Sequence, residues 1–352
     1  MRDVLNILTV PMEANGMALL LARIARELGG LHLAYFGDIP EEMAGYFAGS
    51  VLYRLPDRRR DTRPYLAELA KLVKEKGYTA VHVHGNSATM ALDLAACRRG
   101  GATRRIAQGH NTGAVYARTE KLLRPLFYSL VTDRTACSEA AGEFLYAKRS
   151  FTVLPVPVDA ESFAYDPTAR ELLRRGYGVE DDTILIGTAG TMTEQKNQAL
   201  LIRMLAGLDE RYRLFIAGEG PEREKLEQLA RELNVEERVY MPGHLKDMWA
   251  VYGALDVFAL PSLREGLPTC VLEAVCSGLT CLVSDSVTRE CGVSDKVRFL
   301  PANEEAFARA AEKIVPRERE RASRHGIERV RETGHSIETA AQRYREFWYG
   351  AE

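Results

Sequence analysis

The 352-residue sequence lacks the patterns that mark several classes of protein. It has no run of 18 apolar residues, so no segment predicts a membrane-spanning helix. Its six cysteines form no C-x-x-C pair, and four of them lie in apolar stretches, which is typical of small buried thiols in a reducing compartment. The chain carries an acid as early as Asp3, and the apolar run that follows is short, so no signal peptide is expected. These absences predict a cytoplasmic protein that is soluble or peripheral on the inner face of the plasma membrane.

Motifs for common cofactors and for nucleic acid are also missing. No complete G-x-G-x-x-G follows the first expected strand, so nothing indicates a nicotinamide site, and the histidines show no metal-ligand spacing. The sequence has neither a basic motif nor an aromatic platform of the kind that binds nucleic acid. No cofactor, no metal and no nucleic-acid partner are therefore expected.

Charge is nearly balanced at −2, but it is distributed unevenly. Residues 1–150 contain 21 Lys and Arg against 15 Asp and Glu, an excess of +6, and the remainder carries −8. The densest positive run is Arg58-Arg59-Arg60 with Arg63 close by. A solvated surface run explains such a cluster, and an anionic membrane surface is the candidate partner that the asymmetry favours.

The apolar pattern alternates short buried runs with amphipathic stretches, which is typical of an α/β fold. The length suffices for two domains that each bury a core. An extended, proline-stiffened run at 151–159, followed by a polar stretch to Asp182, is the predicted hinge. Strands are expected at 4–10, 31–36, 79–84, 104–108, 183–189, 212–217, 256–260, 279–284 and 297–300.

The stretch 261–274, PSLREGLPTCVLEA, combines a strand end, a loop and a helix start. Asp256 to Leu260 predicts a buried strand, and Pro268 suits the first turn of a helix that runs to about Cys276. In a parallel sheet such a loop lies at the carboxyl end of a strand, and the free amides at the helix start favour anions. The stretch therefore predicts a corner that binds phosphate.

Glu265 and Glu273 lie eight positions apart in this stretch. On one helix they would be about 12 Å apart, beyond the roughly 5 to 9.5 Å at which paired carboxylates hydrolyse a glycosidic bond. The spacing is therefore not that of a hydrolase. Two such acids could instead hold the hydroxyl-bearing ends of a nucleotide sugar, and two solvated glutamates on a surface helix remain the alternative.

Three parts of this stretch, Pro261-Ser262, Glu265-Gly266-Leu267-Pro268 and Glu273-Ala274, resemble the signature of retaining glycosyltransferases of the GT-B fold, family four (group 1). The segments 83–88, 109–112, 136–138 and 195–198 are similar to those of bacterial capsular and exopolysaccharide enzymes. The resemblance implies two Rossmann-like α/β domains that face each other across a cleft. It assigns residues 1–157 to the acceptor side, 158–335 to nucleotide-sugar binding, and 336–352 to a helix that packs back on the first domain.

The resemblance also implies a role for individual residues. His110, Lys196 and Glu265 would be catalytic: Glu265 orients the transferred sugar, His110 faces it from the first domain, and Lys196 neutralises the departing diphosphate. Glu273 would bind the ribose. Thr191 departs from the family, which usually has arginine at this position. The expected donor-binding residues are Asn15, Gly16, Gly190, Thr191, Lys196, His244, Leu245, Gly266, Leu267, Pro268 and Glu273.

Simpler interpretations remain beside some of these assignments. Asn15-Gly16 also fits a plain turn with an N-cap, and His110 also fits a histidine whose nitrogens bond to loop backbone. His82 and His84 share one face of an expected strand, which favours hydrogen bonding in the core or cleft over metal binding.

The function that the resemblance implies is retaining, metal-independent transfer of a hexose from a nucleotide-diphosphate sugar, with UDP as the expected nucleotide. The acceptor would be a saccharide or a lipid-linked saccharide in cell-surface polysaccharide synthesis. Two alternatives stay open. One is a nucleotide-sugar 2-epimerase of the same architecture, and the other is a catalytically silent nucleotide-sugar binding protein, which Thr191 favours.

Overall fold

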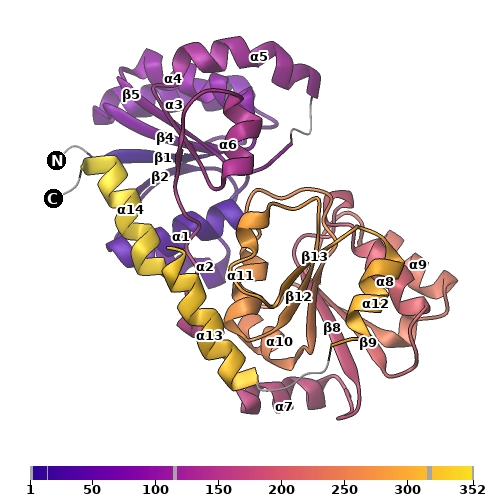
Figure 1. The fold of residues 1–352 in the computed structure, drawn as a ribbon. Coiled ribbons are helices and arrows are strands. Elements are labelled where there is room, and N and C mark those ends of the chain that lie inside the picture. Colours follow the sequence, from indigo (N-terminus) through magenta and orange to yellow (C-terminus); the bar gives the residue numbers. More distant parts are fainter. Residues whose placement is uncertain (1–2, 14, 114–116, 315–318, 351–352) are drawn as a thin grey trace. The chain divides into compact units, whose positions relative to one another are not determined.

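A computed structural model describes residues 3–13, 15–113, 117–314 and 319–350, and the chain divides into two compact units. Unit 1 comprises Met1–Pro157 and Ile337–Glu352, and unit 2 comprises Val158–Ser336. Each unit is a parallel sheet whose strands alternate with helices (Figure 1). The expected boundary at residue 157 coincides with this division. The expected start of the last segment, Ser336, instead lies in unit 2, where it bridges Val158.

Unit 1 contains a seven-stranded sheet in the order β3-β2-β1-β4-β5-β6-β7, in which every neighbouring pair is parallel. β2 and β3 lie on one side of β1, and β4 to β7 lie on the other side. The topological switch point is therefore between β1 and β4. Its strands are β1 (Val4–Leu8), β2 (His32–Tyr35), β3 (Val51–Arg54), β4 (Ala80–Gly85), β5 (Arg104–Gly109), β6 (Asp133–Ala136) and β7 (Thr152–Val153). Its helices are α1 (Gly16–Leu28), α2 (Glu41–Ala44), α3 (Thr62–Lys76), α4 (Ala91–Gly100), α5 (Ala117–Leu130), α6 (Glu139–Tyr146) and α14 (Ile337–Tyr349), with short 3-10 turns η1 (Gly45–Phe47) and η2 (Ala88–Met90).

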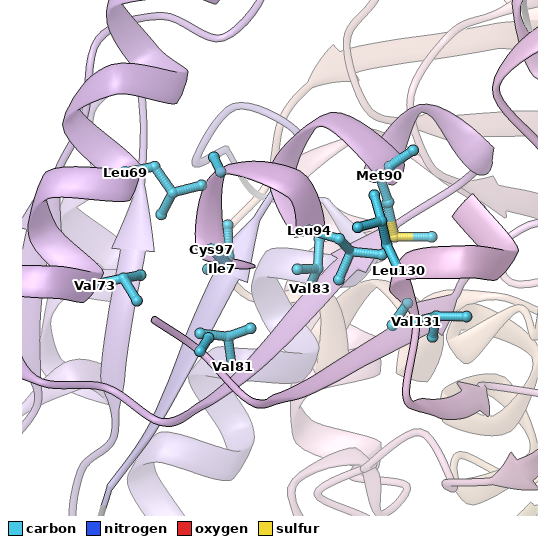
Figure 2. Close-up of a cluster of buried hydrophobic side chains, with 14 of the residues drawn as sticks. Ile7, Leu69, Val73, Val81, Val83, Met90, Leu94, Cys97, Leu130 and Val131 are labelled. Carbon is cyan, nitrogen blue, oxygen red and sulfur yellow. The ribbon is translucent and has the colours of Figure 1, made fainter. Parts of the chain in front are cut away.

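The core of unit 1 forms where the helices cover the central strands (Figure 2). All five residues of β1 are buried, as expected for a strand covered on both faces. Ile7, Val81 and Val83 from the sheet meet Leu94 from α4 and Leu69 from α3 in one apolar cluster. Burial of such side chains contributes roughly 1.5 to 3 kcal/mol each, which makes this cluster a main stabilising feature of the unit.

Helix α14 returns to unit 1 through polar contacts with the ends of its strands. Gln108 Nε2 donates to the Tyr344 hydroxyl at 2.6 Å, and the Arg104 guanidinium donates to the carbonyl oxygens of Phe347 and Trp348 at 2.8 and 2.7 Å. These contacts, together with the packing of α14 against α1, join the last segment of the chain to the first.

Unit 2 contains a six-stranded parallel sheet in the order β10-β9-β8-β11-β12-β13, with its switch point between β8 and β11. Its strands are β8 (Ile184–Ala189), β9 (Tyr212–Ala217), β10 (Val239–Gly243), β11 (Val257–Leu260), β12 (Thr280–Ser284) and β13 (Val297–Leu300). Its helices are α7 (Pro167–Gly176), α8 (Gln198–Ala206), α9 (Arg223–Glu232), α10 (Met248–Ala254), α11 (Thr269–Cys276), α12 (Glu304–Ala311) and α13 (Arg319–Glu332), and its 3-10 turns are η3 (Glu161–Phe163), η4 (Glu194–Lys196), η5 (Glu236–Arg238) and η6 (Arg289–Cys291).

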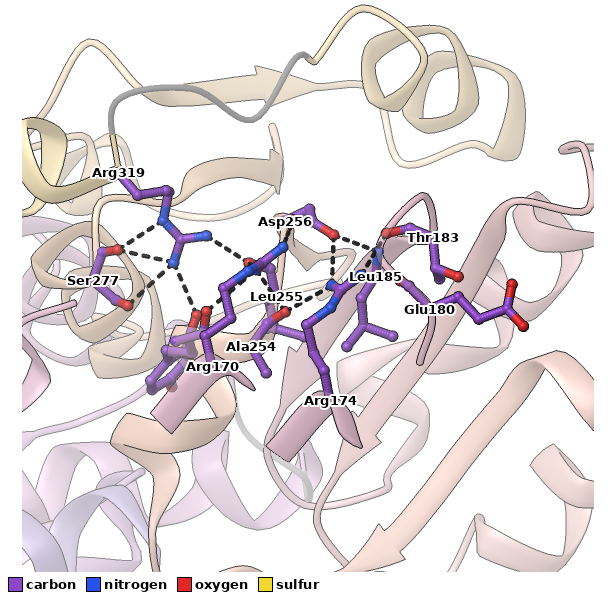
Figure 3. A network of polar contacts seen from close by, with 12 residues as sticks. Arg170, Arg174, Glu180, Thr183, Leu185, Ala254, Leu255, Asp256, Ser277 and Arg319 are labelled. Atoms are coloured by element: carbon purple, nitrogen blue, oxygen red, sulfur yellow. Dashed lines mark hydrogen bonds and ion pairs between the residues drawn. The ribbon is translucent and has the colours of Figure 1, made fainter. Parts of the chain in front are cut away.

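A buried ionic network holds the amino end of β11 (Figure 3). Asp256 accepts hydrogen bonds from Arg170 Nη2 at 2.6 Å, from Arg174 Nη1 at 3.1 Å and from the Leu185 amide at 2.8 Å. Arg319 donates to the backbone oxygens of Tyr252, Leu255 and Ser277 close by. The network lies at the end of the strand opposite to the loop 261–268, and its groups bond to one another, so we assign it to stability.

The structure corrects one prediction about the segment that joins the units. The polar stretch to Asp182 that follows the predicted hinge was expected to lack regular structure, but it contains α7, whose first turn is capped by Asp166 with Pro167 at its start. Asp-Pro at a helix start is a recognisable signal, and the charged composition of α7 concealed it. Within the described residues, no helix combines the length and the apolar character needed to cross a membrane.

Candidate functional site

The carboxyl ends of β8 and β11 meet at the switch point of unit 2. Because the loops that follow these two strands leave in opposite directions, a crevice opens between them in folds of this type. The loop after β8 runs through η4, and the loop after β11 is 261–268. The two stretches that the sequence singled out for the donor therefore lie next to each other.

Three hydrogen bonds join these loops. The Leu263 amide donates to the Gln195 carbonyl oxygen at 2.8 Å, and Gln195 Nε2 donates to the Arg264 carbonyl oxygen at 2.9 Å. Asn197 Nδ2 donates to the Pro261 carbonyl oxygen at 3.3 Å. Backbone atoms on one loop are thus held by a side chain or backbone on the other, which fixes the shape of both.

An ion pair between Lys196 and Glu265 lies at the centre of this arrangement. Lys196 Nζ is 2.7 Å from Glu265 Oε1, and the side chains are only 19% and 12% exposed. Burial by itself lowers the pKa of the Lys196 ammonium, but the neighbouring Glu265 carboxylate more than offsets it, so this pKa lies above its usual range. Lys196 is therefore a fixed positive charge at neutral pH.

Glycines make room for the lysine and for the loop. Gly190 has a φ of 138°, and a Cβ there would approach Lys196 Cε to 3.1 Å. Gly218, with a φ of 143°, packs so closely that a Cβ would lie 2.1 Å from the Gly190 carbonyl oxygen. Both positions require glycine, since L side chains rarely adopt such a φ and no space remains for them.

Glu273 lies on α11, inside the same unit, with 7% of its surface exposed. The hydroxyl of Tyr252, on α10, donates to Glu273 Oε2 at 2.9 Å and holds the carboxylate in place. A buried carboxylate that is oriented by a tyrosine contradicts the alternative of a solvated surface glutamate. Glu265 is likewise mostly buried, so the simpler interpretation is wrong for both acids.

The start of α11 separates these two glutamates along the chain. Pro268 occupies the N-cap and supplies no side-chain hydrogen bond to the first turn. Gly266, Leu267 and Pro268 are buried and lead directly into the helix. Cys270, in the first turn, has a pKa raised by burial to about 12, so its thiol remains protonated. The first turn of α11 can therefore offer its amides to an anion without competition from a thiolate.

Thr191 lies in the loop that follows β8, and His244 and Leu245 lie in the loop that follows β10. Thr191 is exposed, and its carbonyl oxygen accepts from Gln198 Nε2 at 3.3 Å. His244 is exposed and Leu245 is half-buried, both just after β10. Their predicted donor contacts stay predictions, as do the roles assigned to the other residues of unit 2.

Asn15 and Gly16 belong to the first loop of unit 1, where the simpler interpretation holds for the local structure. The Asn15 side chain caps α1 by accepting from the amides of Met17 and Ala18. A Cβ at Gly16 would meet no atom within 4 Å, so packing inside the unit does not require glycine there. Any contact of this pair with the donor remains a prediction.

His110 follows β5 in unit 1 and contacts His84, which in turn contacts Asn6. Its Nε2 is 3.3 Å from His84 Nδ1, and His84 Nε2 is 3.1 Å from Asn6 Oδ1. Burial lowers the pKa of His110 to about 3, so it is neutral. Nε2 of His110 thus belongs to a side-chain chain that enters the core, and the alternative of bonding to loop backbone stays a prediction for Nδ1.

Sequence reasoning missed several partners of the predicted residues. Tyr252 lies 21 positions from its partner Glu273, Gln195 lies 69 positions from Arg264, and Asn6 lies 78 positions from His84. The one signal in the sequence was the His82-x-His84 spacing, which predicts two side chains on the same face because alternate residues of a strand share a face. Among the described residues, no group of three or more His, Cys, Asp or Glu is placed to hold a metal ion.

The fold places the chain in the GT-B class of two-unit α/β proteins. The solved structure of Anabaena Alr3699/HepE in complex with UDP and glucose aligns with a TM-score of 0.81 at 17% identity, covering 98% of this chain and 99% of that one. Sucrose-phosphate synthase from Thermosynechococcus elongatus aligns with a TM-score of 0.81 at 18% identity, covering 99% of this chain and 100% of that one. At such identities these likenesses show the fold alone.

Sequence comparison supports a family. Residues 169–329, which lie within unit 2, match the family model of glycosyl transferases group 1. The protein named as glycosyltransferase EpsF in Bacillus subtilis (strain 168) is 34% identical over 241 residues, which are 64% of this chain and 62% of that protein. The UDP-Gal:alpha-D-GlcNAc-diphosphoundecaprenol alpha-1,3-galactosyltransferase of Escherichia coli is 27% identical over 250 residues, 66% of this chain and 64% of that enzyme. The chain thus matches less than two thirds of the length of these relatives, and the predicted resemblance to group 1 glycosyltransferases of the GT-B fold is confirmed.

Proposed function

We propose that the chain is a retaining glycosyltransferase that moves a hexose from a UDP-sugar to a saccharide or lipid-linked saccharide. The observation that carries the proposal is the Lys196–Glu265 ion pair, held between two loops beside the first turn of α11. A buried cation with adjacent helix amides suits a diphosphate, and the neighbouring carboxylate suits a sugar hydroxyl. The names of the Escherichia coli galactosyltransferase and of the UDP-bound structural relative support UDP as the nucleotide.

In this proposal the diphosphate departs from the side on which the acceptor attacks. Lys196 and the α11 amides stabilise the negative charge that develops on the leaving oxygen, and that oxygen accepts the proton of the incoming hydroxyl. Glu265 orients the sugar, and Glu273 accepts from the ribose hydroxyls while Tyr252 holds it. The role of His110 toward the sugar stays a prediction from the resemblance. No protein nucleophile, metal or cofactor takes part.

The donor assay combines binding with product analysis. Purified protein is titrated with UDP-glucose, UDP-galactose and UDP-N-acetylglucosamine by calorimetry, then incubated with each bound donor and a set of lipid-linked and free saccharide acceptors, with and without EDTA. Release of UDP together with an α-linked product, in both conditions, is the expected result. Inversion at the anomeric carbon, or loss of activity with EDTA that returns with a divalent cation, would contradict the mechanism.

Thr191 gives a specific reason to test the silent alternative. It is an exposed, neutral side chain at a position where the family usually has arginine. A binder would retain UDP-sugar affinity and release no UDP with any acceptor, whereas an epimerase would yield a new free UDP-sugar without acceptor. The same product analysis separates the three functions.

We also propose that unit 1 docks on an anionic membrane, through a surface other than the one expected from the sequence. Arg58, the first residue of the Arg58–Arg60 run, is only 15% exposed and forms a bidentate pair with the buried Asp93 at 3.0 and 2.6 Å. It therefore holds α4 rather than lipid. Arg59 and Arg60 are exposed, but no apolar group of the run accompanies them.

Helix α5 combines exposed apolar side chains with exposed basic ones, a combination that the Arg58–Arg60 run lacks. Leu122 and Leu126, four positions apart on one helix face, are 78% and 42% exposed, and Arg118 and Lys121 are exposed beside them. Glu120, the acid of this helix, turns inward and accepts from the Ala88 amide at 2.6 Å. The outer face of α5 is therefore apolar and basic, which suits an anionic bilayer.

Vesicle binding tests this surface. Binding to vesicles with 30% anionic lipid is expected and should weaken with salt, while neutral vesicles bind poorly. Leu122→Glu should weaken binding at least about tenfold, since a leucine that enters a bilayer contributes roughly 1.5 to 3 kcal/mol. Leu172→Glu is the matched control, because Leu172 is 61% exposed on α7 of unit 2. Equal binding of both variants would contradict the assignment.

A further inference from the structure

Lys196 lies between two residues whose side-chain amides bond to the loop after β11. Gln195 Nε2 donates to the Arg264 carbonyl oxygen at 2.9 Å, and Asn197 Nδ2 donates to the Pro261 carbonyl oxygen at 3.3 Å. Both amide side chains are half-buried in unit 2. Neither has a place in the mechanism given above, although they are the direct neighbours of its main cation.

The hydrogen bond of Gln195 lies next to both members of the ion pair. It joins the residue before Lys196 to the residue before Glu265, and the two charged side chains meet at 2.7 Å. A lysine side chain is a flexible four-carbon stem, and holding it in one geometry costs conformational entropy. A bond between the two loops one residue away restricts where both side chains begin. It therefore reduces the freedom that the pair must lose.

Asn197 sets the direction of the chain just after Lys196. Its φ of 55° and ψ of 36° are left-handed, and this residue ends η4 and begins α8. Among the described residues, Ala147 and Asn234 are the others that combine a side chain with a positive φ. Most side chains avoid this conformation, and asparagine is one of the few that adopt it. The turn and the bond to Pro261 therefore hold the backbone on the second side of Lys196.

We propose that Gln195 and Asn197 are positioning residues, which hold the Lys196 ammonium where the donor diphosphate requires it. The inference rests on the proposed function and adds two residues that act on the reaction without touching the substrate. They act through backbone oxygens of the loop 261–268, and no covalent bond forms or breaks in this role. Because charge on the leaving oxygen develops in the transition state, a displaced Lys196 lowers turnover more than it lowers donor affinity.

The ion pair can be measured without any activity. The pH dependence of acetylation by trace acetic anhydride, followed for each lysine by mass spectrometry, gives the pKa of the Lys196 ammonium. In the wild type, burial lowers this pKa, but the Glu265 carboxylate more than offsets it, so the pKa lies above its usual range. Gln195→Met removes the hydrogen-bond donor at nearly constant volume. The pair should then loosen and the pKa should fall, and an unchanged pKa in folded Gln195→Met would overturn the role of Gln195.

Variants of Asn197 separate its hydrogen bond from its backbone conformation. Asn197→Gly keeps the left-handed turn and removes the bond, whereas Asn197→Ala removes the bond and disfavours the turn. At saturating donor, kcat should fall roughly 2- to 10-fold in Asn197→Gly, the value of one hydrogen bond, and further in Asn197→Ala. Asn234 is exposed in the turn after α9 and has a φ of 54°, so Asn234→Gly and Asn234→Ala are matched controls. Equal kcat in Asn197→Ala and Asn234→Ala would contradict the role of Asn197.

A comparison of turnover with affinity distinguishes positioning from a merely structural effect. In Gln195→Met, kcat at saturating UDP-sugar should fall roughly 5- to 100-fold, because a misplacement of about 1 Å can cost up to about 100-fold, while UDP affinity should change less than about twofold. Gln228→Met, at an exposed position of α9, is the matched control and should change neither quantity. Losses of kcat and UDP affinity that are equal, or lower stability with unchanged kcat, would contradict the positioning role.

Failure of the positioning role is distinguishable from failure of the proposed function. If the wild type releases no UDP with any acceptor, the proposed function fails, and the pKa of Lys196 in the variants still tests whether Gln195 and Asn197 hold the ion pair. If the wild type transfers sugar, and the variants match it in kcat and in the pKa of Lys196, only the positioning role fails.

Discussion

Lowering the pH from 7.5 to 5.5 is expected to destabilise unit 1 through His82, His84 and His110. Burial keeps the pKa of the first two well below the usual range and that of His110 at about 3, so all three stay neutral in the folded unit throughout this interval. In the unfolded chain they titrate with a pKa of about 6.5. The unfolded state therefore binds more protons as the pH falls, and stability that is complete above the unfolded pKa is lost below it.

The magnitude follows from the unfolded pKa. One histidine that is protonated only when unfolded costs about 1.4 kcal/mol of stability at pH 5.5, and three cost about 4 kcal/mol. Domains are typically stable by only about 5 to 15 kcal/mol, so this loss is a large fraction of the total. Carboxylates begin to contribute at lower pH, which is why the interval ends at 5.5.

The two tryptophans allow unit 1 to be observed alone. Trp348 is buried in unit 1 beside His82, and Trp249 is partly exposed in unit 2. In a Trp249→Phe variant, tryptophan fluorescence during urea unfolding reports unit 1, and the free energy of unfolding is measured at steps of half a pH unit. We expect it to fall by about 4 kcal/mol between pH 7.5 and 5.5.

Histidine variants identify the groups responsible. His82→Gln removes one titrating group, so the change with pH should shrink by about a third, whatever the variant does to stability at pH 7.5. His325→Asn, at an exposed position, should leave the change unaltered. A free energy of unfolding that varies by less than about 1 kcal/mol over the interval would refute the reasoning, because it would mean that the three histidines gain protons without unfolding.

Three further predictions concern unit 2. Lys196→Ala should lower turnover at saturating donor more than donor affinity, because the leaving diphosphate gains charge in the transition state, and Thr191→Arg should raise turnover; steady-state kinetics with one acceptor checks both. Glu273→Ala should weaken UDP binding by about 1.5 to 3 kcal/mol and Tyr252→Phe by less, as measured by calorimetry, and unchanged affinity in folded Glu273→Ala would remove the ribose assignment. Asp256→Ala should destabilise unit 2 by about 3 to 5 kcal/mol in urea unfolding, since it leaves the buried Arg174 and the partly buried Arg170 without their carboxylate.

The sequence alone predicted most strands and the α/β class, because a buried strand is a local apolar run. The run expected at 212–217 is β9, and that at 297–300 is β13, both to the residue. The strand, loop and helix of 256–276 were also predicted, since Pro268 and the apolar run beside it are local signals. The helix α7 was missed where charge hid a short amphipathic pattern, although its Asp-Pro start was readable.

The resemblance carried by 261–274 also concentrated the candidate site in two neighbouring loops of unit 2. Those positions form a compact corner in unit 2, and the match of residues 169–329 supports the family from which the residue roles were taken. The roles themselves remain predictions, since they depend on a bound donor. The surroundings of Arg58 could not be predicted. A run of arginines in the sequence gave no sign that its first member pairs with the buried Asp93.

Tertiary structure decided which of these residues touch. Lys196 and Glu265 are 69 positions apart, and they meet because β8 and β11 are neighbours at the switch point, a pairing that neither strand encodes locally. The contact of His84 with Asn6 arises in the same way, because β4 and β1 are neighbours in the sheet of unit 1. Local sequence determines the hydrophobic periodicity and the ends of helices and strands. Contacts between side chains that are distant in sequence depend on strand order and register, which are selected only when the core packs.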